Sequence, residues 1–292
     1  MAHHYFELES GRKLGISALG EPTATRLVVL CLPTPGAGPF DPDPEATIAS
    51  GVRVIEIDRP GYGGSDPLPN GTEPTVEGFA DDIAEYLQRV ERVADEITGI
   101  QFGTVGIVGW SFGGAIATSF AARHPQLTDC VVIIGSPDPH TLRKGQRYSA
   151  ISELRKHGIE KSFNSLRASI RDDGPPSLFS LGVDGADPAL APLGVRGRLE
   201  RMLENAWMQD GHGIAADRLA VRTDKWADVV GRLDVPALLL YGCQDAVASE
   251  SDAKWYAKRF HDPVIMSVPD EGHLVLLTHW HQVLEFVTKS AH

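Results

Sequence analysis

The sequence predicts an α/β protein with a mostly parallel sheet, for three reasons. Short apolar runs, typical of buried strands, alternate with helical stretches along most of the 292 residues. One of these runs ends in a glycine-rich turn that opens directly into a helix. Between residues 139 and 226 the strand signals vanish, and short helical stretches divided by joints rich in Pro and Gly take their place.

The first half of the chain supplies most of the predicted strands. Residues 5–18 have the pattern of an opening antiparallel pair, and the apolar run from Leu27 to Leu30 indicates a strand buried on both faces. An amphipathic helix is predicted where apolar residues recur at helical spacing from Phe79 to Val90. In chain order, the predicted elements are the strand pair 5–18, strands 26–32 and 52–57, helix 75–98, and strands 105–108 and 130–134.

The second half of the chain returns to strands after the helical segment. Its predicted elements are strand 236–241 with helix 249–260 and strand 263–268 with helix 274–289. We therefore expect an α/β core formed by residues 1–138 and 227–292. Residues 139–226 are expected to form an inserted helical cap that covers one edge of the sheet and excludes water from it.

A serine lies at the apex of the glycine-rich turn, between Gly109 and Gly113. Small residues two positions before and two after Ser111 let the strand and helix backbones approach closely, and the turn lifts the hydroxyl clear of both elements. The start of the following helix presents free N–H groups where an oxyanion would form. We therefore take Ser111 as a candidate nucleophile.

An acid and a histidine follow, each in a loop after its own predicted strand. Asp245 comes after strand 236–241, and His273 after strand 263–268. The order serine, acid, histidine is that of one hydrolase architecture. A second acid, Asp138, also follows a strand, but it lies between two prolines at the start of the insert and is interpreted as a turn residue.

Four segments resemble motifs of the α/β-hydrolase superfamily. They are residues 58–66 (the loop after the fourth strand), 109–114 (the nucleophile elbow), 242–245 (the acid loop) and 271–273 (the histidine loop). The resemblance runs from about Tyr5 to the C-terminus except for the middle insert. It implies an eight-stranded sheet flanked by helices, and a serine esterase or proline iminopeptidase-like branch with a helical cap. It also implies catalysis by Ser111, Asp245 and His273.

The loop after the third strand departs from the family pattern. Members usually carry His-Gly-x-Pro-Gly there, but this chain has Leu32 and Pro33 in place of the His-Gly pair. Since Pro33 and Pro35 have no N–H, Thr34 is the backbone donor left between them for an oxyanion hole. The second donor is expected to be the N–H of Phe112, which follows the nucleophile.

The candidate substrate-pocket residues are bulky and apolar. They are Trp110, Phe40, Phe179 and Trp207, with Leu178 and Met208 as further candidates, and packing within the core and cap explains them equally well. His279 and His281 lie two apart on a predicted helix and so do not share a face. We therefore expect no metal site and no cofactor.

The composition is that of a soluble enzyme. The chain has 27 Lys and Arg against 39 Asp and Glu, a formal net charge of −12 that argues against nucleic acid or an anionic membrane as a partner. The three cysteines lie on or beside predicted strands and are expected to be small core residues in a reducing compartment. No signal peptide or membrane-spanning run is visible, so a cytoplasmic location is expected. The expected assembly is a monomer or homodimer that acts on a small-molecule substrate.

These observations favour one activity and leave others open. We expect a serine hydrolase that cleaves a carboxylic ester, or a similar acyl bond, of a small to medium, largely apolar substrate through an acyl-enzyme. A proline-specific aminopeptidase is ranked second, because relatives with that activity carry a tryptophan where this chain has Phe112. A carbon–carbon bond hydrolase and a ligand-binding relative without catalysis are further alternatives.

Overall fold

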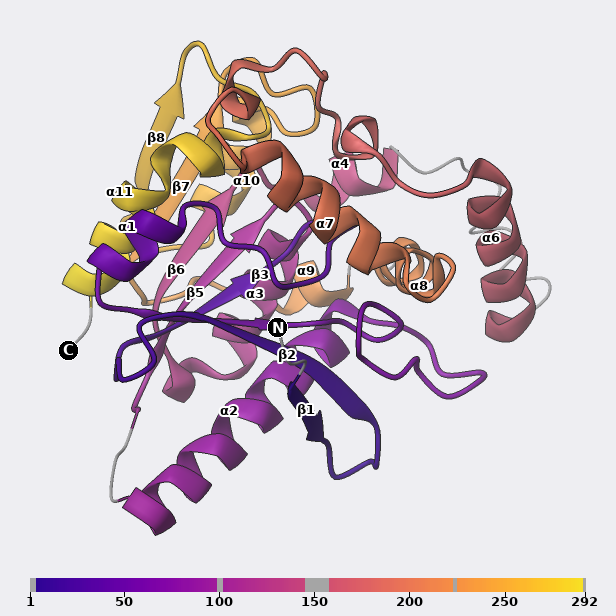
Figure 1. Ribbon diagram of the computed structural model, residues 1–292, viewed down its shortest axis with the longest axis horizontal. Coiled ribbons are helices and arrows are strands. Elements are labelled where there is room, and N and C mark those ends of the chain that lie inside the picture. The colour runs from indigo at the N-terminus through magenta and orange to yellow at the C-terminus, as the bar shows by residue number, and fades with distance from the viewer. Residues whose placement is uncertain (1–3, 99–101, 145–157, 223–224, 291–292) are drawn as a thin grey trace.

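A computed structural model of the chain describes residues 4–98, 102–144, 158–222 and 225–290. These residues form one eight-stranded sheet with helices on both faces (Figure 1). The strand order is β1-β2-β4-β3-β5-β6-β7-β8, in which β1–β2 and β2–β4 are antiparallel and all other neighbours are parallel. The predicted α/β class with a mostly parallel sheet is confirmed.

The strands lie close to the predicted runs. Their bounds are β1 His4–Glu7, β2 Lys13–Gly20, β3 Leu27–Cys31, β4 Arg53–Ile57, β5 Val105–Trp110, β6 Thr128–Ile134, β7 Ala237–Gly242 and β8 Val264–Val268. The helices that flank the sheet are α1 Pro44–Ala49, α2 Val76–Thr98, α3 Gly113–Arg123, α10 Glu250–Ala257 and α11 Val275–Lys289.

Alternate residues of the central strands enter opposite layers of the hydrophobic core. Val29 and Ile107 pack in one layer with α2 and α3, whereas Val28 and Val108 pack in the other with α11. Because helices cover both faces, β3 and β5 are buried along their whole length. This explains why these strands show continuous apolar runs rather than alternation.

The segment between β6 and β7 contains helices, and its described residues contribute no strand to the sheet. Its elements are α4 Pro139–Lys144, α6 Ile159–Asp173, η2 Leu178–Leu181, η3 Pro188–Leu190, α7 Val195–Trp207, α8 His212–Ala220 and α9 Lys225–Val229, where η marks a 3₁₀ helix. Figure 1 shows α6 lying outermost, beyond α8. The division into a core and a cap at residues 139 and 226 stays a prediction, and residues 145–157 of the expected cap lie outside the described residues.

Helices α7 and α8 and the turn between them are hydrogen-bonded to two loops at the edge of the sheet. Asn205 of α7 donates from Nδ2 to the carbonyl of Gly38 at 2.8 Å. Gln209 donates from Nε2 to the carbonyl of Ser65 at 2.7 Å, and the Gly213 N–H donates to the carbonyl of Gly61 at 2.9 Å. These contacts anchor α7 and α8 to the loops that follow β3 and β4.

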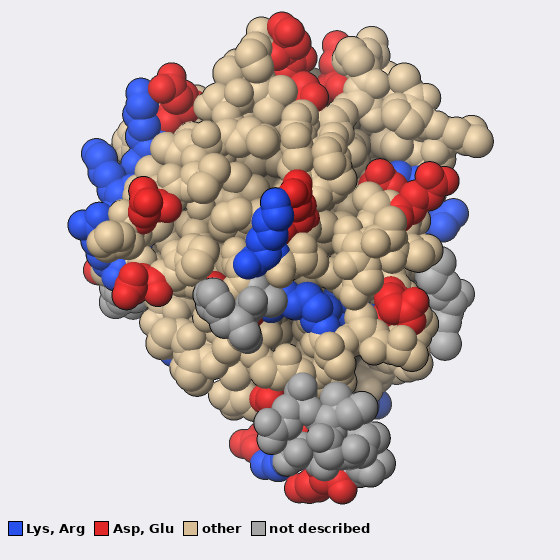
Figure 2. Space-filling model, turned by 90° about the vertical axis from the view of Figure 1, so that its left-hand side faces the viewer, with Lys and Arg blue, Asp and Glu red and all other residues tan. Residues whose placement is uncertain are grey.

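The three cysteines differ in their exposure to solvent. Cys31 and Cys130 are buried, but Cys243 is exposed, contrary to the expectation, because it lies in the loop beyond β7. On the face shown in Figure 2, charged side chains of both signs are scattered over a mostly uncharged surface. In the described part of the chain, every helix is too short or too polar to cross a membrane.

Candidate active site

Ser111 occupies a strained turn between β5 and α3. Its φ of 55° is in the left-handed region, and it is only 7% exposed. A Cβ at Gly109 would lie 2.3 Å from the Gly113 carbonyl oxygen, and a Cβ at Gly113 would lie 2.0 Å from that of Cys31. Both positions therefore require glycine, and the close backbone approach that they permit is that of a nucleophile elbow.

His273 and Asp245 form a buried pair at the same edge of the sheet. His273 Nδ1 lies 2.8 Å from Asp245 Oδ2, and their side chains are 2% and 0% exposed. The other carboxylate oxygen, Oδ1, accepts the N–H groups of Val247 at 2.7 Å and Ala248 at 3.1 Å. These two bonds fix the carboxylate, which in turn fixes the imidazole ring with Nε2 as its remaining nitrogen.

Trp110 joins this pair to the serine. Its indole Nε1 donates to the carbonyl of His273 at 3.1 Å, and the two rings lie 5.8 Å apart between centroids. On the other side, the Ser111 N–H donates to the carbonyl of Ile134 at 2.9 Å. The next residue, Gly135, has its ideal Cβ position 3.0 Å from Asp245 Oδ2. The structure thus brings the serine, the acid and the histidine to one edge, although Ser111 Oγ makes no hydrogen bond with the described residues.

The two predicted oxyanion-hole donors, Thr34 and Phe112, follow the ends of β3 and β5. The N–H groups of Thr34 and Phe112 donate to no acceptor among the residues that the structure describes. Phe112 stands at the N-terminus of α3, where N–H groups have no partner within the helix. Both predicted donors are therefore available to a bound oxygen atom.

A buried ionic cluster beside Thr34 was not predicted from the sequence. Arg59 donates to Asp217 from Nε at 2.9 Å and from Nη2 at 2.7 Å, and Tyr62 donates to the same carboxylate at 2.7 Å. Burial alone would lower the pKa of Arg59, but Asp217 and Tyr62 raise it above its ordinary value, so the guanidinium is cationic. A signal existed in the sequence, because Asp217 is the one acid on a helix face that is otherwise apolar.

The four pocket candidates are placed differently from one another. Phe40 and Trp110 are both buried and their rings stack with centroids 5.8 Å apart. Trp207 is half-buried and packs with Ile170, away from these two rings. Phe179 is 86% exposed, so the structure does not bring it to the site.

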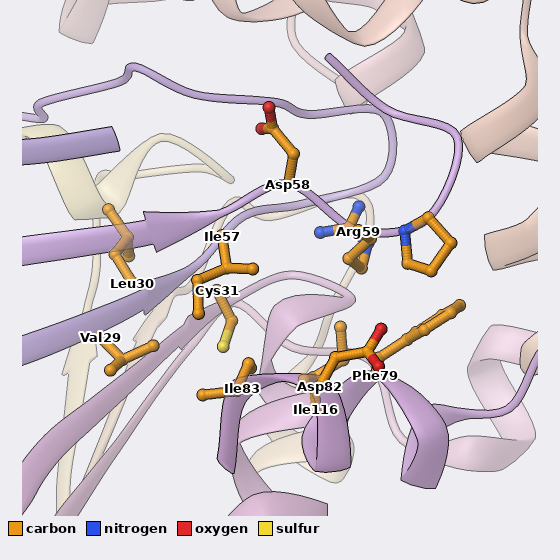
Figure 3. Close-up of a pocket in the computed structure, with 11 residues that line it drawn as sticks. Val29, Leu30, Cys31, Ile57, Asp58, Arg59, Phe79, Asp82, Ile83 and Ile116 are labelled. Carbon is orange, nitrogen blue, oxygen red and sulfur yellow. The ribbon is translucent and has the colours of Figure 1, made fainter. Parts of the chain in front are cut away.

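Neither of two partly open pockets is lined by the serine, the acid or the histidine. A cavity of about 10 Å³ lies between the ends of β3 and β4 and helix α2, with Cys31 and Arg59 in its wall and Asp58 pointing away from it (Figure 3). It has room for about one water molecule. A cavity of about 240 Å³ lies at the opposite edge of the sheet, near Leu27 and Val105.

The remaining polar candidates have local partners. Asp138 accepts the N–H of Thr141 at 2.7 Å and so stands at the start of α4, in keeping with its interpretation as a turn residue. His279 Nδ1 lies 3.3 Å from Glu271 Oε2. The described residues contain no group of three or more His, Cys, Asp or Glu side chains arranged to hold a metal ion.

Comparison with known proteins identifies the family. The model of the alpha/beta hydrolase family matches residues 27–286, so the chain belongs to this family. The esterase EaEST from Exiguobacterium antarcticum superimposes with a TM-score of 0.69 at 19% identity, over 99% of this chain and 98% of that one. The enol-lactonase from Burkholderia xenovorans LB400 gives a TM-score of 0.65 at 17% identity, over 98% and 99% of the two chains.

Curated relatives are similar over most of the chain. A pimeloyl-(acyl-carrier protein) methyl ester esterase from Chromobacterium violaceum is 26% identical over 245 residues, which are 80% of this chain and 81% of that protein. A 2-hydroxy-6-oxononadienedioate/2-hydroxy-6-oxononatrienedioate hydrolase from Cupriavidus pinatubonensis is 33% identical over 221 residues, which are 72% and 68% of the two proteins.

Proposed function

We propose that the protein is a serine hydrolase that cleaves a carboxylic ester of a small to medium, largely apolar substrate through an acyl-enzyme. The main support is the buried His273–Asp245 pair, 2.8 Å apart, placed beside the strained turn of Ser111. The two N–H groups without acceptors, at Thr34 and Phe112, complete the set of groups that acyl transfer requires. The esterases among the relatives and structural neighbours agree with this chemistry.

The first half of the reaction forms the acyl-enzyme. Neutral His273 accepts the proton of the Ser111 hydroxyl through Nε2 while the serine oxygen attacks the ester carbonyl carbon. The carbonyl oxygen becomes an oxyanion that the N–H groups of Thr34 and Phe112 stabilise, and Asp245 stabilises the imidazolium. Collapse of the tetrahedral intermediate breaks the bond to the alkoxy group, which leaves as an alcohol with the proton from His273.

The second half releases the acid. Water gives its proton to His273 as its oxygen attacks the acyl carbon, and the same two N–H groups hold the second oxyanion. Collapse returns the proton to the Ser111 oxygen and frees the carboxylic acid. The burial of Ser111, His273 and Asp245 excludes bulk water, which strengthens each of these electrostatic contacts.

A carbon–carbon bond hydrolase is the second candidate. It is favoured by the relative from Cupriavidus pinatubonensis, whose identity of 33% exceeds the 26% of the esterase from Chromobacterium violaceum. Both activities use a serine, an acid, a histidine and an oxyanion hole, so the site alone does not distinguish them. The leaving group distinguishes them, because a carbon leaving group must accept its proton on carbon, whereas the alkoxy group of an ester accepts its proton on oxygen.

Labelling with a fluorophosphonate probe tests the serine hydrolase. We expect labelling of the wild-type protein that is lost in Ser111→Ala, and its absence in the wild type would favour a ligand-binding protein. A substrate panel then tests the bond that is cleaved. We expect p-nitrophenyl acyl esters to be hydrolysed at least ~10-fold faster than a vinylogous 1,5-diketone or proline p-nitroanilide. Faster cleavage of the diketone or of the anilide would contradict the proposed esterase and favour the corresponding activity.

We also propose that the enzyme works in the cytoplasm as a monomer or homodimer. The exposed Cys243 is a free thiol, and such a group persists most readily in a reducing compartment. Size-exclusion chromatography with light scattering tests the oligomeric state. A larger assembly would contradict the proposal.

A further inference from the structure

The carboxylate of Asp217 is a meeting point between helix α8 and two loops of the sheet. The residue is 1% exposed. Besides Arg59 and Tyr62, the Thr34 hydroxyl donates to its Oδ2 at 2.5 Å. Four hydrogen bonds therefore converge on one buried carboxylate, and they come from the loop after β3 and the loop after β4.

Arg59 extends this contact to the backbone beside Thr34. Its Nη1 donates to the carbonyl of Leu32 at 2.9 Å, and its Nη2 donates to the carbonyl of Pro33 at 2.8 Å. The Pro33 carbonyl and the Thr34 N–H belong to one planar trans peptide unit and point in opposite directions. Holding the carbonyl against Arg59 therefore aims the N–H away from Arg59, and the Thr34 side chain is held by the same cluster.

We propose that Asp217 is a positioning residue that couples helix α8 to the oxyanion hole. It orients Arg59 in a bidentate pair, and Arg59 orients the peptide whose N–H stabilises the oxyanion. This inference rests on the proposed function and names the group that sets the geometry of its site.

Other contacts hold α7 and α8 in place when Asp217 is changed. Asn205, Gln209 and Gly213 bond to Gly38, Ser65 and Gly61 independently of Asp217. A substitution at Asp217 should therefore leave the helices docked and alter the alignment of Thr34. In Asp217→Asn, the amide nitrogen must face either Arg59 Nε or the donors on Oδ2, so at least one bond is lost in either orientation.

The chain offers a matched control at the opposite edge of the sheet. Asp129 receives both Arg26 Nη1 and, at 2.7 Å, Arg26 Nη2, and the Thr104 hydroxyl donates to it at 2.8 Å. Asp129→Asn therefore disturbs the same kind of Arg–Asp–Thr cluster without touching the site. It controls for loss of stability.

The experiment compares Asp217→Asn, Arg59→Lys and Asp129→Asn with the wild type on p-nitrophenyl butyrate. We expect kcat to fall ~10- to 100-fold in Asp217→Asn and Arg59→Lys with KM within about 2-fold, because a misaligned oxyanion donor weakens the transition state and not the bound ester. The dissociation constant of a boronic acid, which forms a tetrahedral adduct on the serine, should rise in parallel with the loss of kcat. Asp129→Asn should retain the wild-type kcat.

A second readout does not depend on catalysis. The amide ¹H–¹⁵N resonance of Thr34 should shift in Asp217→Asn and Tyr62→Phe and stay in place in Asp129→Asn. A folded Asp217→Asn protein with an unchanged Thr34 resonance and wild-type kcat overturns the inference. If the wild type is not labelled by the fluorophosphonate, the proposed function fails, and the Thr34 resonance still decides whether Asp217 orients this peptide. If Asp217→Asn does not fold, Tyr62→Phe, which removes one bond to the carboxylate, takes its place.

Discussion

Two Arg–Asp–Thr clusters lie at opposite edges of the same sheet, and one of them is buried whereas the other is partly buried. At the carboxyl ends of the strands, Arg59 and Thr34 bond to Asp217. At the amino ends, Arg26 and Thr104 bond to Asp129. In both clusters the arginine makes two bonds to the carboxylate and further bonds to backbone carbonyls, so the local chemistry is nearly the same.

The backbone partners of the two arginines differ. Arg26 donates to the carbonyls of Thr104 and Val287, and thereby joins the start of β5 to the end of α11. Arg59 donates to the carbonyls of Leu32 and Pro33, next to a predicted oxyanion donor. The two ion pairs therefore differ in their position in the sheet and not in the type of contact. Arg26–Asp129 joins elements of the fold, whereas Arg59–Asp217 holds the loop that is proposed to serve the reaction.

The largest effect is expected for Ser111→Ala, which tests the carboxyl edge as the reactive edge. Ester turnover should fall by on the order of 10⁶-fold, because the nucleophile is lost while the oxyanion hole stays. The melting temperature should change little, since alanine accepts the φ of 55° no worse than serine does. Steady-state kinetics and thermal unfolding of the same preparation measure both, with His273→Ala as the parallel variant. Near-full turnover in either variant would refute the mechanism.

Asp245→Asn should lower kcat by on the order of 10⁴-fold. The N–H groups of Val247 and Ala248 require an acceptor at the Oδ1 position, so the new amide nitrogen must take the place of Oδ2 and donate to His273 Nδ1. The ring is then forced into the tautomer with its proton on Nε2, which cannot accept the proton of Ser111.

A pH profile of kcat/KM, together with the ¹⁵N shifts of the His273 ring, checks this explanation. The shifts should show Nε2–H in the variant and Nδ1–H in the wild type. A variant with the wild-type tautomer and a large loss of rate would contradict the role given to the carboxylate.

Much of the sheet and of the site could be predicted from local patterns. Strands such as β5 and β7 are buried on both faces, which leaves an unmistakable apolar run, and Ser111, Asp245 and His273 each follow such a run directly. Even the Thr34 donor followed from elimination, because its proline neighbours have no N–H. These features depend on residues that are near one another in the sequence.

The features that could not be predicted depend on distant residues or on packing. Arg59 and Asp217 are 158 positions apart, so no local pattern indicates that they pair. Phe179 lies in an irregular segment where apolar character does not decide burial, and it is exposed. The partners of Asp217 had to be seen in three dimensions, although its isolation on an apolar helix face indicated that it needed some.

Asp129→Asn sharpens the comparison from the amino edge. Breaking this partly buried pair should destabilise the fold by about 2 kcal/mol, between the values for exposed and for fully buried pairs, with kcat unchanged. Burial alone would raise the pKa of Asp129, but Arg26 and Thr104 outweigh it and hold the pKa below its ordinary value. The stability from this carboxylate is therefore present above the pKa of the unfolded chain, about 3.9, and is lost as the pH falls through the lower folded value. Urea unfolding at pH 7 and pH 3 should show a difference between variant and wild type that shrinks at the lower pH.

The smallest effect concerns Glu56, another buried acid, which lies on β4 near the carboxyl edge and has no arginine partner in the described residues. It is 1% exposed, and its Oε2 accepts the N–H of Phe40 at 2.9 Å while Oε1 has no partner in the described structure. Burial raises the pKa of Glu56 well above its ordinary value, so the folded protein retains a proton that the unfolded chain releases.

Because the folded state binds this extra proton, the free energy of unfolding must decrease as the pH rises above the unfolded pKa of about 4.3. Glu56→Gln keeps an acceptor for Phe40 and removes the titration. The variant should melt at least about 2 °C above the wild type at pH 8, and the gain should be smaller at pH 5, where the unfolded glutamate has only begun to release its proton. Thermal unfolding across this range measures the difference. An increase in melting temperature that is the same at both pH values would assign the effect to packing. An increase that grows with pH shows that a buried acid without an arginine partner at this edge weakens the fold because it holds its proton.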